Sequence, residues 1–375
     1  MSKDDLVLNI AGGGPPRDPV KEVFGRDSFV NDLKKRLAYT SVEMYAPRRL
    51  GKSWVLRLLE VKAGPEKVAI YFDLERHHSL YEFVVALAKV ENSSLTKIKV
   101  AMGKIMETLV VKGTKMENYN FPWKDRLDEI FKEMNNLDTP VWLLLDEFPI
   151  MINNLITDKK ESEAKEFLDY MRFARQNYSN IKFVLTGSIG LHWIIDRLEK
   201  TGWRNPQNDV EKITLTSLSH EDATRLAEGI LRGQKEDPQP GKDLAQVTSG
   251  HPFYIQKAIT RWSDRKTNED MESFCDRIAQ SIEDPFEFND LDKHMGHYFR
   301  RNTPLAKRVT DVLAGESAVL PKEVVQRLSD DPENIINILR KLEMDGYTQS
   351  DNGKYHLYPP LFRRWWKNKR EGLYE

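Results

Sequence analysis

The sequence is poor in cysteine, with Cys275 alone among 375 residues. A single cysteine excludes an intramolecular disulfide and a cysteine-based zinc site. Cys275 lies in an apolar-patterned run, residues 272–282, which favours a buried core position. No apolar run approaches the ~18 residues that a membrane-spanning helix needs. The N-terminal MSKDD also lacks the hydrophobic region of a signal peptide. We therefore expect a cytoplasmic protein.

An excess of charge of either sign is also missing, since the formal net charge is -1. The chain as a whole therefore has no field that draws it onto nucleic acid or a membrane, and any basic surface must be local. A hydrophobic fraction of 40% and a charged fraction of 31% are ordinary for a globular protein. At this length, two or three domains are expected. We find no internal repeat and no low-complexity tract.

Strand and helix patterns alternate in the first half of the chain. Residues 1–23 have a loop composition, with three glycines and three prolines in 11–19. Apolar runs predict strands at 41–45, 67–74, 141–147, 181–187 and 210–216. Amphipathic patterns predict helices from Asp27 and at 51–62, 79–90, 93–111, 123–137 and 161–176. Such alternation predicts an α/β domain with a five-stranded parallel sheet covered on both faces, ending near residue 217.

The second half of the chain is predominantly helical. Residues 218–283 carry only helical stripes, which predicts a small helical domain. Three helices follow at 303–315, 320–330 and 331–346. An Asn352-Gly353 turn between two short strands then predicts a hairpin. This order is expected of a winged helix, so we place domains at 1–23, 24–217, 218–283 and 284–375, the last with a basic C-terminal tail.

The segment from Ala46 to Ser53 fits the P-loop pattern GxxxxGK[ST], except that alanine replaces the first glycine. In such a loop successive backbone N–H groups curl around phosphates and the following helix offers its N-terminus to the anion. Gly51 allows close approach, Lys52 places a cation at the β- and γ-phosphates, and Ser53 gives a hydroxyl to Mg²⁺. Ala46 is tolerable if its φ is negative. A chance match occurs in roughly a few per cent of chains this long, so a second signal is needed.

That second signal is the run from Val141 to Glu147, an apolar strand that ends in two acids. Two acids at the end of a buried strand are costly unless they face a cation or a solvated cleft. In a P-loop domain Asp146 would hold the Mg²⁺ shell and Glu147 would polarise the attacking water. A weaker third signal is Thr186-Gly187-Ser188 at the end of the next strand. Its hydroxyls could contact the γ-phosphate or the water, or could form a plain turn.

Taken together, these residues resemble the AAA-type ATPases of the archaeal-ATPase and STAND group, distant relatives of the Orc/Cdc6 initiators. The resemblance covers nearly the whole chain. Its matching segments are Phe24-Gly25-Arg26-Asp27, Tyr45-Ala46-Pro47-Arg48-Arg49-Leu50-Gly51-Lys52-Ser53, Leu145-Asp146-Glu147-Phe148-Pro149, Leu185-Thr186-Gly187-Ser188, Leu215-Thr216-Ser217-Leu218-Ser219 and Gly250-His251-Pro252-Phe253. Two departures are Ala46 in place of glycine and the lack of a long repeat array after the winged helix.

The resemblance implies an ATPase with ATP and Mg²⁺ as ligands, a helical lid and a winged helix, with nucleotide between the P-loop domain and the lid. The residues expected to act in catalysis are Glu147, Lys52, Thr186 and Ser188. Those expected to bind nucleotide are Gly25, Arg26, Ala46, Pro47, Arg48, Arg49, Leu50, Gly51, Lys52, Ser53, Trp54, His251 and Pro252, with Mg²⁺ at Ser53 and Asp146. A neighbouring subunit often supplies an arginine in such families, and Arg172, Arg175, Arg197 and Arg204 are the candidates, between which the sequence does not choose.

Several other polar groups have a plainer interpretation. His77 and His78 are expected in a solvated loop, and His294 and His297 lack a third metal ligand. A lysine-rich helix over 93–111 is expected to be a solvated face, with a nucleic-acid or partner surface as the alternative. In the third helix of the winged-helix region, Asn334, Asn337, Arg340 and Lys341 could read DNA. Residues 301–375 hold 13 Lys and Arg against 11 Asp and Glu, a weak footprint for DNA, so a protein-interaction or packing role is favoured.

Three uses of the nucleotide site remain open. The first is a regulatory switch ATPase whose output is self-assembly or the binding of a protein partner. The second is a DNA-binding ATPase that grips duplex through the winged helix and basic tail. The third is a non-hydrolysing, nucleotide-dependent scaffold, which the replacement at Ala46 suggests.

Overall fold

The computed structural model of the chain describes residues 6–10, 16–89, 121–199 and 202–374. Within these ranges the chain divides into two compact units, each of which is discontinuous in sequence. One comprises Asp27–Tyr45 and Lys52–Thr214 and contains the large sheet; the other comprises Met1–Arg26, Ala46–Gly51 and Leu215–Glu375. We call them the sheet unit and the helical unit. The helix expected over 93–111 lies outside the described residues.

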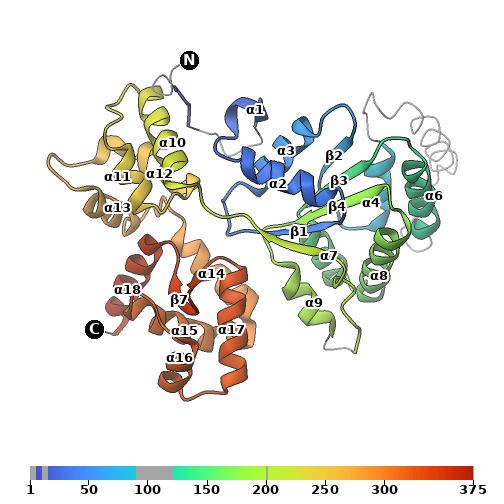
Figure 1. Ribbon diagram of the computed structural model, residues 1–375. Helices are drawn as coiled ribbons and strands as arrows, with labels where there is room; N and C mark the ends of the chain where they lie inside the picture. Colours follow the sequence, from blue (N-terminus) through green and yellow to red (C-terminus); the bar gives the residue numbers. More distant parts are fainter. Residues whose placement is uncertain (1–5, 11–15, 90–120, 200–201, 375) are drawn as a thin grey trace. The chain divides into compact units, whose positions relative to one another are not determined.

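The sheet unit is built on a five-stranded parallel sheet with the order β2-β3-β4-β1-β5 (Figure 1). This confirms the predicted α/β fold class. The strands are β1 Val42–Tyr45, β2 Val68–Asp73, β3 Val141–Asp146, β4 Ile181–Thr186 and β5 Glu211–Thr214. One strand, β4, therefore lies between β1, which leads into the phosphate loop, and β3, which ends in the acids. The carboxyl ends of these strands meet at one edge, where ligands bind in open parallel sheets.

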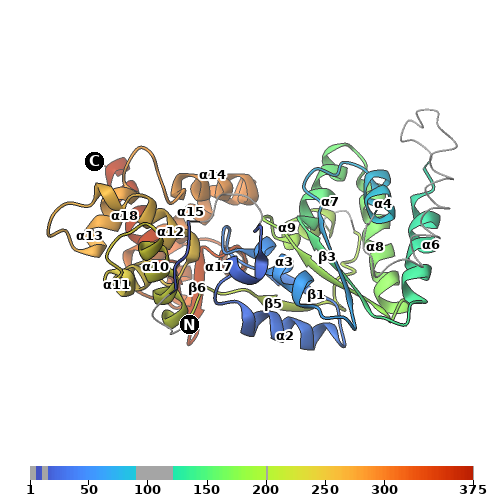
Figure 2. The same cartoon turned by 90° about the horizontal axis from the view of Figure 1, so that it is seen from above.

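Helices cover both faces of this sheet. The helices of the unit are α2 Asp27–Leu37, α3 Lys52–Lys62, α4 Leu80–Ala88, α6 Trp123–Asn135, α7 Phe148–Thr157, α8 Glu161–Asn177 and α9 Leu191–Glu199. Figure 2 shows α2 on one side of the sheet and α4, α7 and α8 on the other. Every residue of β3 is buried, as expected for a strand covered on both faces. The sequence did not reveal α7 or α9.

A large apolar core fills the face covered by α4, α6, α7, α8 and α9. Alternate residues of the strands point into it, among them Ile70, Leu143 and Phe183. Aromatic side chains pack edge to face there; the rings of Phe83 and Phe167, for example, lie 5.5 Å apart. This core fixes the ends of β3 and β4, and therefore Asp146, the last residue of β3, and Glu147 after it.

The helical unit contains the remaining helices and a hairpin. Its elements are α1 Pro19–Glu22, α10 His220–Gly233, α11 Gly241–Val247, α12 Pro252–Thr260, α13 Met271–Ala279, α14 Phe288–Phe299, α15 Thr303–Gly315, α16 Pro321–Leu328, α17 Pro332–Met344, β6 Thr348–Asp351, β7 Lys354–Leu357 and α18 Pro360–Tyr374, with short 3₁₀ turns at Trp262–Asp264 and Arg300–Asn302. The three predicted C-terminal helices and the hairpin are present. Asn352 and Gly353 form its turn with φ of 50° and 77°. The sequence missed α14.

Capping side chains explain where several of these helices begin. Ser219 accepts a hydrogen bond from the backbone N–H of Asp222 at the start of α10. Asp331 does the same for the backbone N–H of Asn334 at the start of α17. Each cap satisfies a backbone donor that the helix itself leaves without a partner. No helix among the described residues is long and apolar enough to cross a membrane.

Candidate nucleotide site

The phosphate loop links β1 to α3, and its backbone angles accommodate the alanine at position 46. Among the described residues with positive φ are Arg49 at 61° and Gly51 at 94°, whereas Ala46 is not one of them. The alanine that replaces the first glycine therefore needs no left-handed backbone, as the sequence argument required. Lys52 and Ser53 open α3, and Trp54 is half-buried in its first turn.

Asp146, the last residue of β3, and Glu147 after it lie beside the first residues of α3. The Asp146 carboxylate is 2% exposed and accepts a hydrogen bond from the Ser53 hydroxyl. Burial raises the pKa of Asp146, and hydrogen bonds from Ser53 and Tyr71 and the charge of Lys52 oppose that rise. A hydroxyl and a carboxylate held together in this way are the two protein ligands that a P-loop offers to Mg²⁺. The donor set therefore fits a magnesium ion, which Ser53 and Asp146 would hold.

Glu147 is held by the turn that follows β4. Its Oε2 atom accepts hydrogen bonds from the backbone N–H and the hydroxyl of Ser188, at 2.8 and 2.9 Å. Its φ of 54° is left-handed, a strained conformation for a residue with a side chain and one that gathers at functional sites. Burial raises the pKa of Glu147, and the backbone N–H of Ser188 opposes the rise. The structure thus brings Glu147, Asp146, Ser53 and Ser188 together at the carboxyl edge of the sheet.

Thr186 takes a different place from its neighbour Ser188. Its side chain is 2% exposed, and its hydroxyl donates to the backbone carbonyl of Met44 on β1 at 2.8 Å. This bond ties β4 to β1 just before the phosphate loop. The expected contact of Thr186 with phosphate or water stays a prediction.

Tyr71 is a residue of this site that the sequence did not single out. Its hydroxyl donates to Asp146 Oδ2 at 2.8 Å, and the Arg57 guanidinium lies 3.6 Å from its ring centre. Tyr71 is paired with Leu144, and Asp73 with Asp146, so Tyr71 lies on the same sheet face as Asp146, two residues back. The hydroxyl of Tyr71, within the apolar part of β2 from Val68 to Phe72, is the signal that could have found it.

In the helical unit, Arg26 joins the phosphate loop to the segment after β5. Its guanidinium donates to the backbone carbonyls of Leu50 at 3.2 Å and Thr216 at 2.7 Å. Burial lowers the pKa of Arg26 to about 10, which still leaves it charged near neutrality. Arg26 therefore stabilises the backbone of the phosphate loop at Leu50.

Gly25 and Gly250 meet the same segment at Leu218. A β-carbon on Gly25 would lie 2.9 Å from a Leu218 methyl, and one on Gly250 would lie 2.5 Å from the Leu218 carbonyl oxygen. Both glycines have a φ of 67°. Leu218 N–H donates to the Gly250 carbonyl at 3.0 Å. Three segments that are far apart in sequence thus form one cluster around Leu218, namely 24–27, 215–219 and 250–253.

His251 follows Gly250 and precedes α12. It is 1% exposed, and its ring stacks on that of Tyr254 with centroids 4.0 Å apart. Pro252 is the first residue of α12. A direct contact of His251 or Pro252 with nucleotide stays a prediction.

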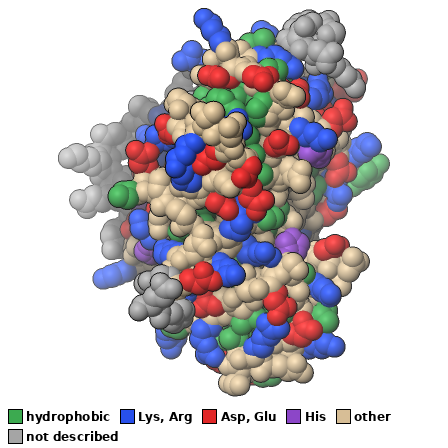
Figure 3. Space-filling view, turned by 90° about the vertical axis from the view of Figure 1, so that its left-hand side faces the viewer, with side chains coloured by type: hydrophobic (Ala, Val, Ile, Leu, Met, Phe, Trp, Pro, Cys, Tyr) green, Lys and Arg blue, Asp and Glu red, His purple; other side chains and the backbone are tan. Residues whose placement is uncertain are grey.

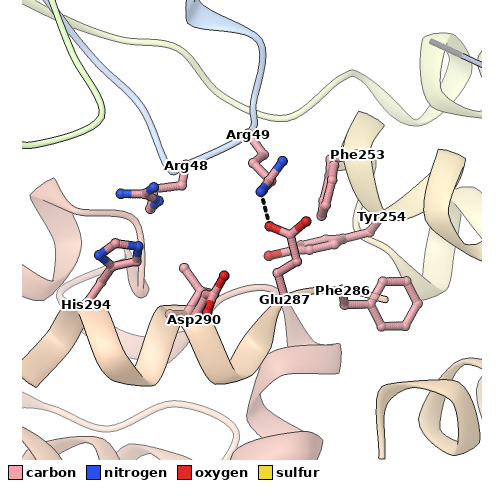
Figure 4. Close-up of a pocket in the computed structure, with 9 residues that line it drawn as sticks. Arg48, Arg49, Phe253, Tyr254, Phe286, Glu287, Asp290 and His294 are labelled. Atoms are coloured by element: carbon pink, nitrogen blue, oxygen red, sulfur yellow. Dashed lines mark ion pairs between the residues drawn. The ribbon is translucent and has the colours of Figure 1, made fainter. Parts of the chain in front are cut away.

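The loop arginines point toward α12 and α14, as Figure 4 shows. Arg49 forms an ion pair with Glu287 and its guanidinium lies 4.7 Å from the ring centre of Phe253. Arg48 donates to the Tyr298 hydroxyl at 3.2 Å. The same pocket is lined by Asp290 and His294, among others.

Of the four arginines considered as contributions to a neighbouring subunit, Arg175 is engaged within its own unit. Its side chain is 3% exposed, forms an ion pair with Asp209 at 2.8 Å and donates to the Pro206 carbonyl. A buried, ion-paired guanidinium is a poor candidate for reaching another subunit. Arg204 is exposed, and Arg172 and Arg197 are half-buried.

Gly187 touches the acid site, which gives a direct test of its geometry. A β-carbon there would lie 2.7 Å from the Pro149 ring and 3.2 Å from Glu147 Oε2. Since the proline ring cannot move aside, we expect Gly187→Ala to displace Glu147 and lower kcat by about tenfold or more. Gly315→Ala, where no atom lies within 4 Å of the added carbon, is the control. Equal turnover in the two variants would show that this contact does not place Glu147.

Comparison with known proteins shows the fold. No protein-family model matches the chain, and no curated protein matches it by sequence. Its structure is similar to that of the Walker-type ATPase PABY2304 of Pyrococcus abyssi, with a TM-score of 0.65 at 16% identity, covering 95% of this chain and 99% of that one. The fold is therefore that of a Walker-type P-loop ATPase, which confirms the resemblance at the level of the fold.

Two further matches are weaker. The ORC2 protein of Aeropyrum pernix gives a TM-score of 0.45 at 11% identity over 98% of this chain and 100% of that one. The ORC1 protein of Aeropyrum pernix, in complex with DNA, gives 0.40 at 14% identity over 94% of each chain. At these TM-scores the likeness is too coarse to bear on function.

Proposed function

We propose that this chain binds a magnesium–nucleoside triphosphate, ATP, at residues 46–53 and hydrolyses it. The observation that carries the proposal is the hydrogen bond between Ser53 and Asp146, with Glu147 next in the chain. A hydroxyl and carboxylate pair at the N-terminus of a helix, beside Lys52, is the arrangement that a triphosphate and its magnesium ion require.

In this function each group of the chain has a distinct task. The backbone of the loop and Lys52 hold the phosphates, while Ser53 and Asp146 hold the metal. Bound Mg²⁺ neutralises charge on the phosphate oxygens. Glu147 orients a water molecule and accepts its proton, and Ser188 holds the Glu147 carboxylate in place.

Release of inorganic phosphate from ATP tests this function. Purified protein is expected to release phosphate with Mg²⁺ present and to stop when EDTA removes the metal. Phosphate release that continues in EDTA would reject the assigned roles of Ser53 and Asp146. ATP binding without any release would favour the non-hydrolysing scaffold instead.

We propose further that hydrolysis serves a regulatory switch, with self-assembly or a protein partner as the output. The supporting observation is that the phosphate loop contacts residues of α12 and α14, which belong to the segments expected as lid and winged helix. Through such contacts, a change of the phosphate loop between the ATP-bound and ADP-bound states can alter the positions of α12 and α14. A change in sedimentation between ATP and ADP would support assembly, whereas identical profiles would favour a separate partner.

DNA binding through the winged-helix segment is the second candidate, and the charges of its tail argue against it. Basic side chains of α18 form ion pairs within the unit: Arg364 with Asp276, Lys369 with Asp292 and Arg370 with Asp311. On the face shown in Figure 3, Lys and Arg are interspersed with Asp and Glu. A salt-dependent shift of duplex DNA would support this role, and its absence at low salt would reject it.

A further inference from the structure

The phosphate loop carries a conformational cost at Arg49. Its φ of 61° is left-handed, which glycine adopts freely and a residue with a β-carbon does not. Such a residue persists only where its surroundings hold it. What holds the Arg49 side chain therefore also holds the backbone of the phosphate loop at this residue.

Two side chains from outside the loop hold Arg49. Glu287, which precedes α14 and is 27% exposed in its side chain, forms an ion pair with the guanidinium. Phe253, the second residue of α12, places its ring 4.7 Å from the same guanidinium. Figure 4 shows the Arg49 guanidinium above the Glu287 carboxylate, with the Phe253 ring to one side. A cation that meets a carboxylate and an aromatic face together is fixed more firmly than by either alone.

The two preceding loop residues meet the same part of the chain. Arg48 donates to the Tyr298 hydroxyl in α14. Pro47 packs against Gly346, where a β-carbon would lie 2.3 Å from the proline ring. Three consecutive loop residues are thus held by α12, by α14 and by the turn before β6.

We propose that Glu287 and Phe253 are positioning residues that keep the phosphate loop in its binding shape through Arg49. This inference rests on the proposed function and concerns how the affinity of the same nucleotide site is regulated. Nucleotide affinity is set from α12 and α14, and a partner that draws either helix away from the loop weakens ATP binding. Because both residues act through Arg49, the effect falls on binding and not on the chemical step.

The first test compares two charge-neutralising variants in titrations with a fluorescent ATP analogue and in steady-state turnover. Glu287→Gln is expected to raise Kd and KM by about threefold to tenfold, the range set by an exposed ion pair with its stacked aromatic. Its kcat is expected to stay within about twofold, because only binding is affected. Asp290→Asn is the matched control, since Asp290 lines the same pocket but pairs with Lys293.

The second test removes the conformational cost of the left-handed backbone at position 49. Arg49→Gly gives the loop a residue that is free to adopt a positive φ, so Glu287 has nothing left to hold. Whatever Arg49→Gly does alone, adding Glu287→Gln to it is expected to change Kd no further. Phe253→Leu is expected to weaken binding in the wild-type background and to have no effect beside Arg49→Gly. Thermal unfolding confirms that each variant is folded.

Two results would overturn the inference. One is equal Kd in Glu287→Gln and Asp290→Asn; the other is a Glu287→Gln effect that persists beside Arg49→Gly. Both leave the proposed function standing, because wild-type protein would still bind ATP. Wild-type protein that binds no analogue at all would instead refute the nucleotide site and this regulation with it.

Discussion

Replacing Glu147 by glutamine is expected to lower kcat for ATP at least about 100-fold, the scale of a lost general base. Glutamine has the same size and can still accept a hydrogen bond from the Ser188 backbone N–H, which now meets the carboxylate at 2.8 Å. It cannot take a proton from water. Phosphate release measures kcat, and a fluorescent ATP analogue measures affinity, which should change little.

The control for Glu147→Gln is Glu166→Gln, which neutralises an exposed carboxylate on α8 that pairs with Lys124. Its kcat should equal that of the wild-type protein. Normal turnover by Glu147→Gln would mean that another group activates the water, and Asp146 would then carry both tasks. Loss of affinity together with turnover would indicate a disturbed fold instead of a lost base.

Replacing Lys52 by alanine is expected to weaken ATP binding at least about 30-fold, the scale of removing one partner from a buried charge pair. Lys52 is 7% exposed and is the first residue of α3. Its charge acts on both Asp146 and Glu147. Without it, the ammonium charge that offsets the two carboxylates and the triphosphate is lost, so binding and turnover both fall.

The control for Lys52→Ala is Lys62→Ala, at the opposite end of the same helix. Lys62 forms an ion pair with Asp27 near the surface, at the end of α3 away from Asp146 and Glu147. Titration with the ATP analogue should separate the two variants, with Lys62→Ala close to wild type. Equal affinities would place the nucleotide elsewhere on the chain.

The sheet was predictable because its strands are unusually apolar. All residues of β3 are buried, and β2 and β4 are nearly so, which short continuous apolar runs signal well. Helix α7 was not predicted because six of its ten residues are buried, so it lacks the broad polar face that marks an amphipathic helix. Helix α9 has only nine residues, too few for a clear helical period. Helix α14 begins after a left-handed Glu287, and the carboxylate that accepts from its first two N–H groups belongs to Asp284, which lies outside the usual N-cap position, so the sequence does not mark the start of the helix in the usual way.

The sequence predicted those site residues that belong to a local motif. It did not predict residues whose contacts join distant parts of the sequence. Ser53, Asp146 and Glu147 follow from the phosphate loop and the acid strand. Tyr71 contacts Asp146 only because β2 pairs with β3. Glu287 pairs with Arg49 across 238 positions of sequence. A local sequence pattern could reveal neither of these contacts. Ser188 lies between these cases, since its position after β4 was visible but its bond to Glu147 was not.

The most direct test of the account is a crystal structure of the chain with Mg²⁺ and a non-hydrolysable ATP analogue. We expect the phosphates against the backbone N–H groups of residues 48–53, with the metal at the Ser53 hydroxyl and Asp146 beside it. Nucleotide bound at any other place, or a loop left empty at saturating analogue and Mg²⁺, would contradict the assignment of this chain as an ATPase.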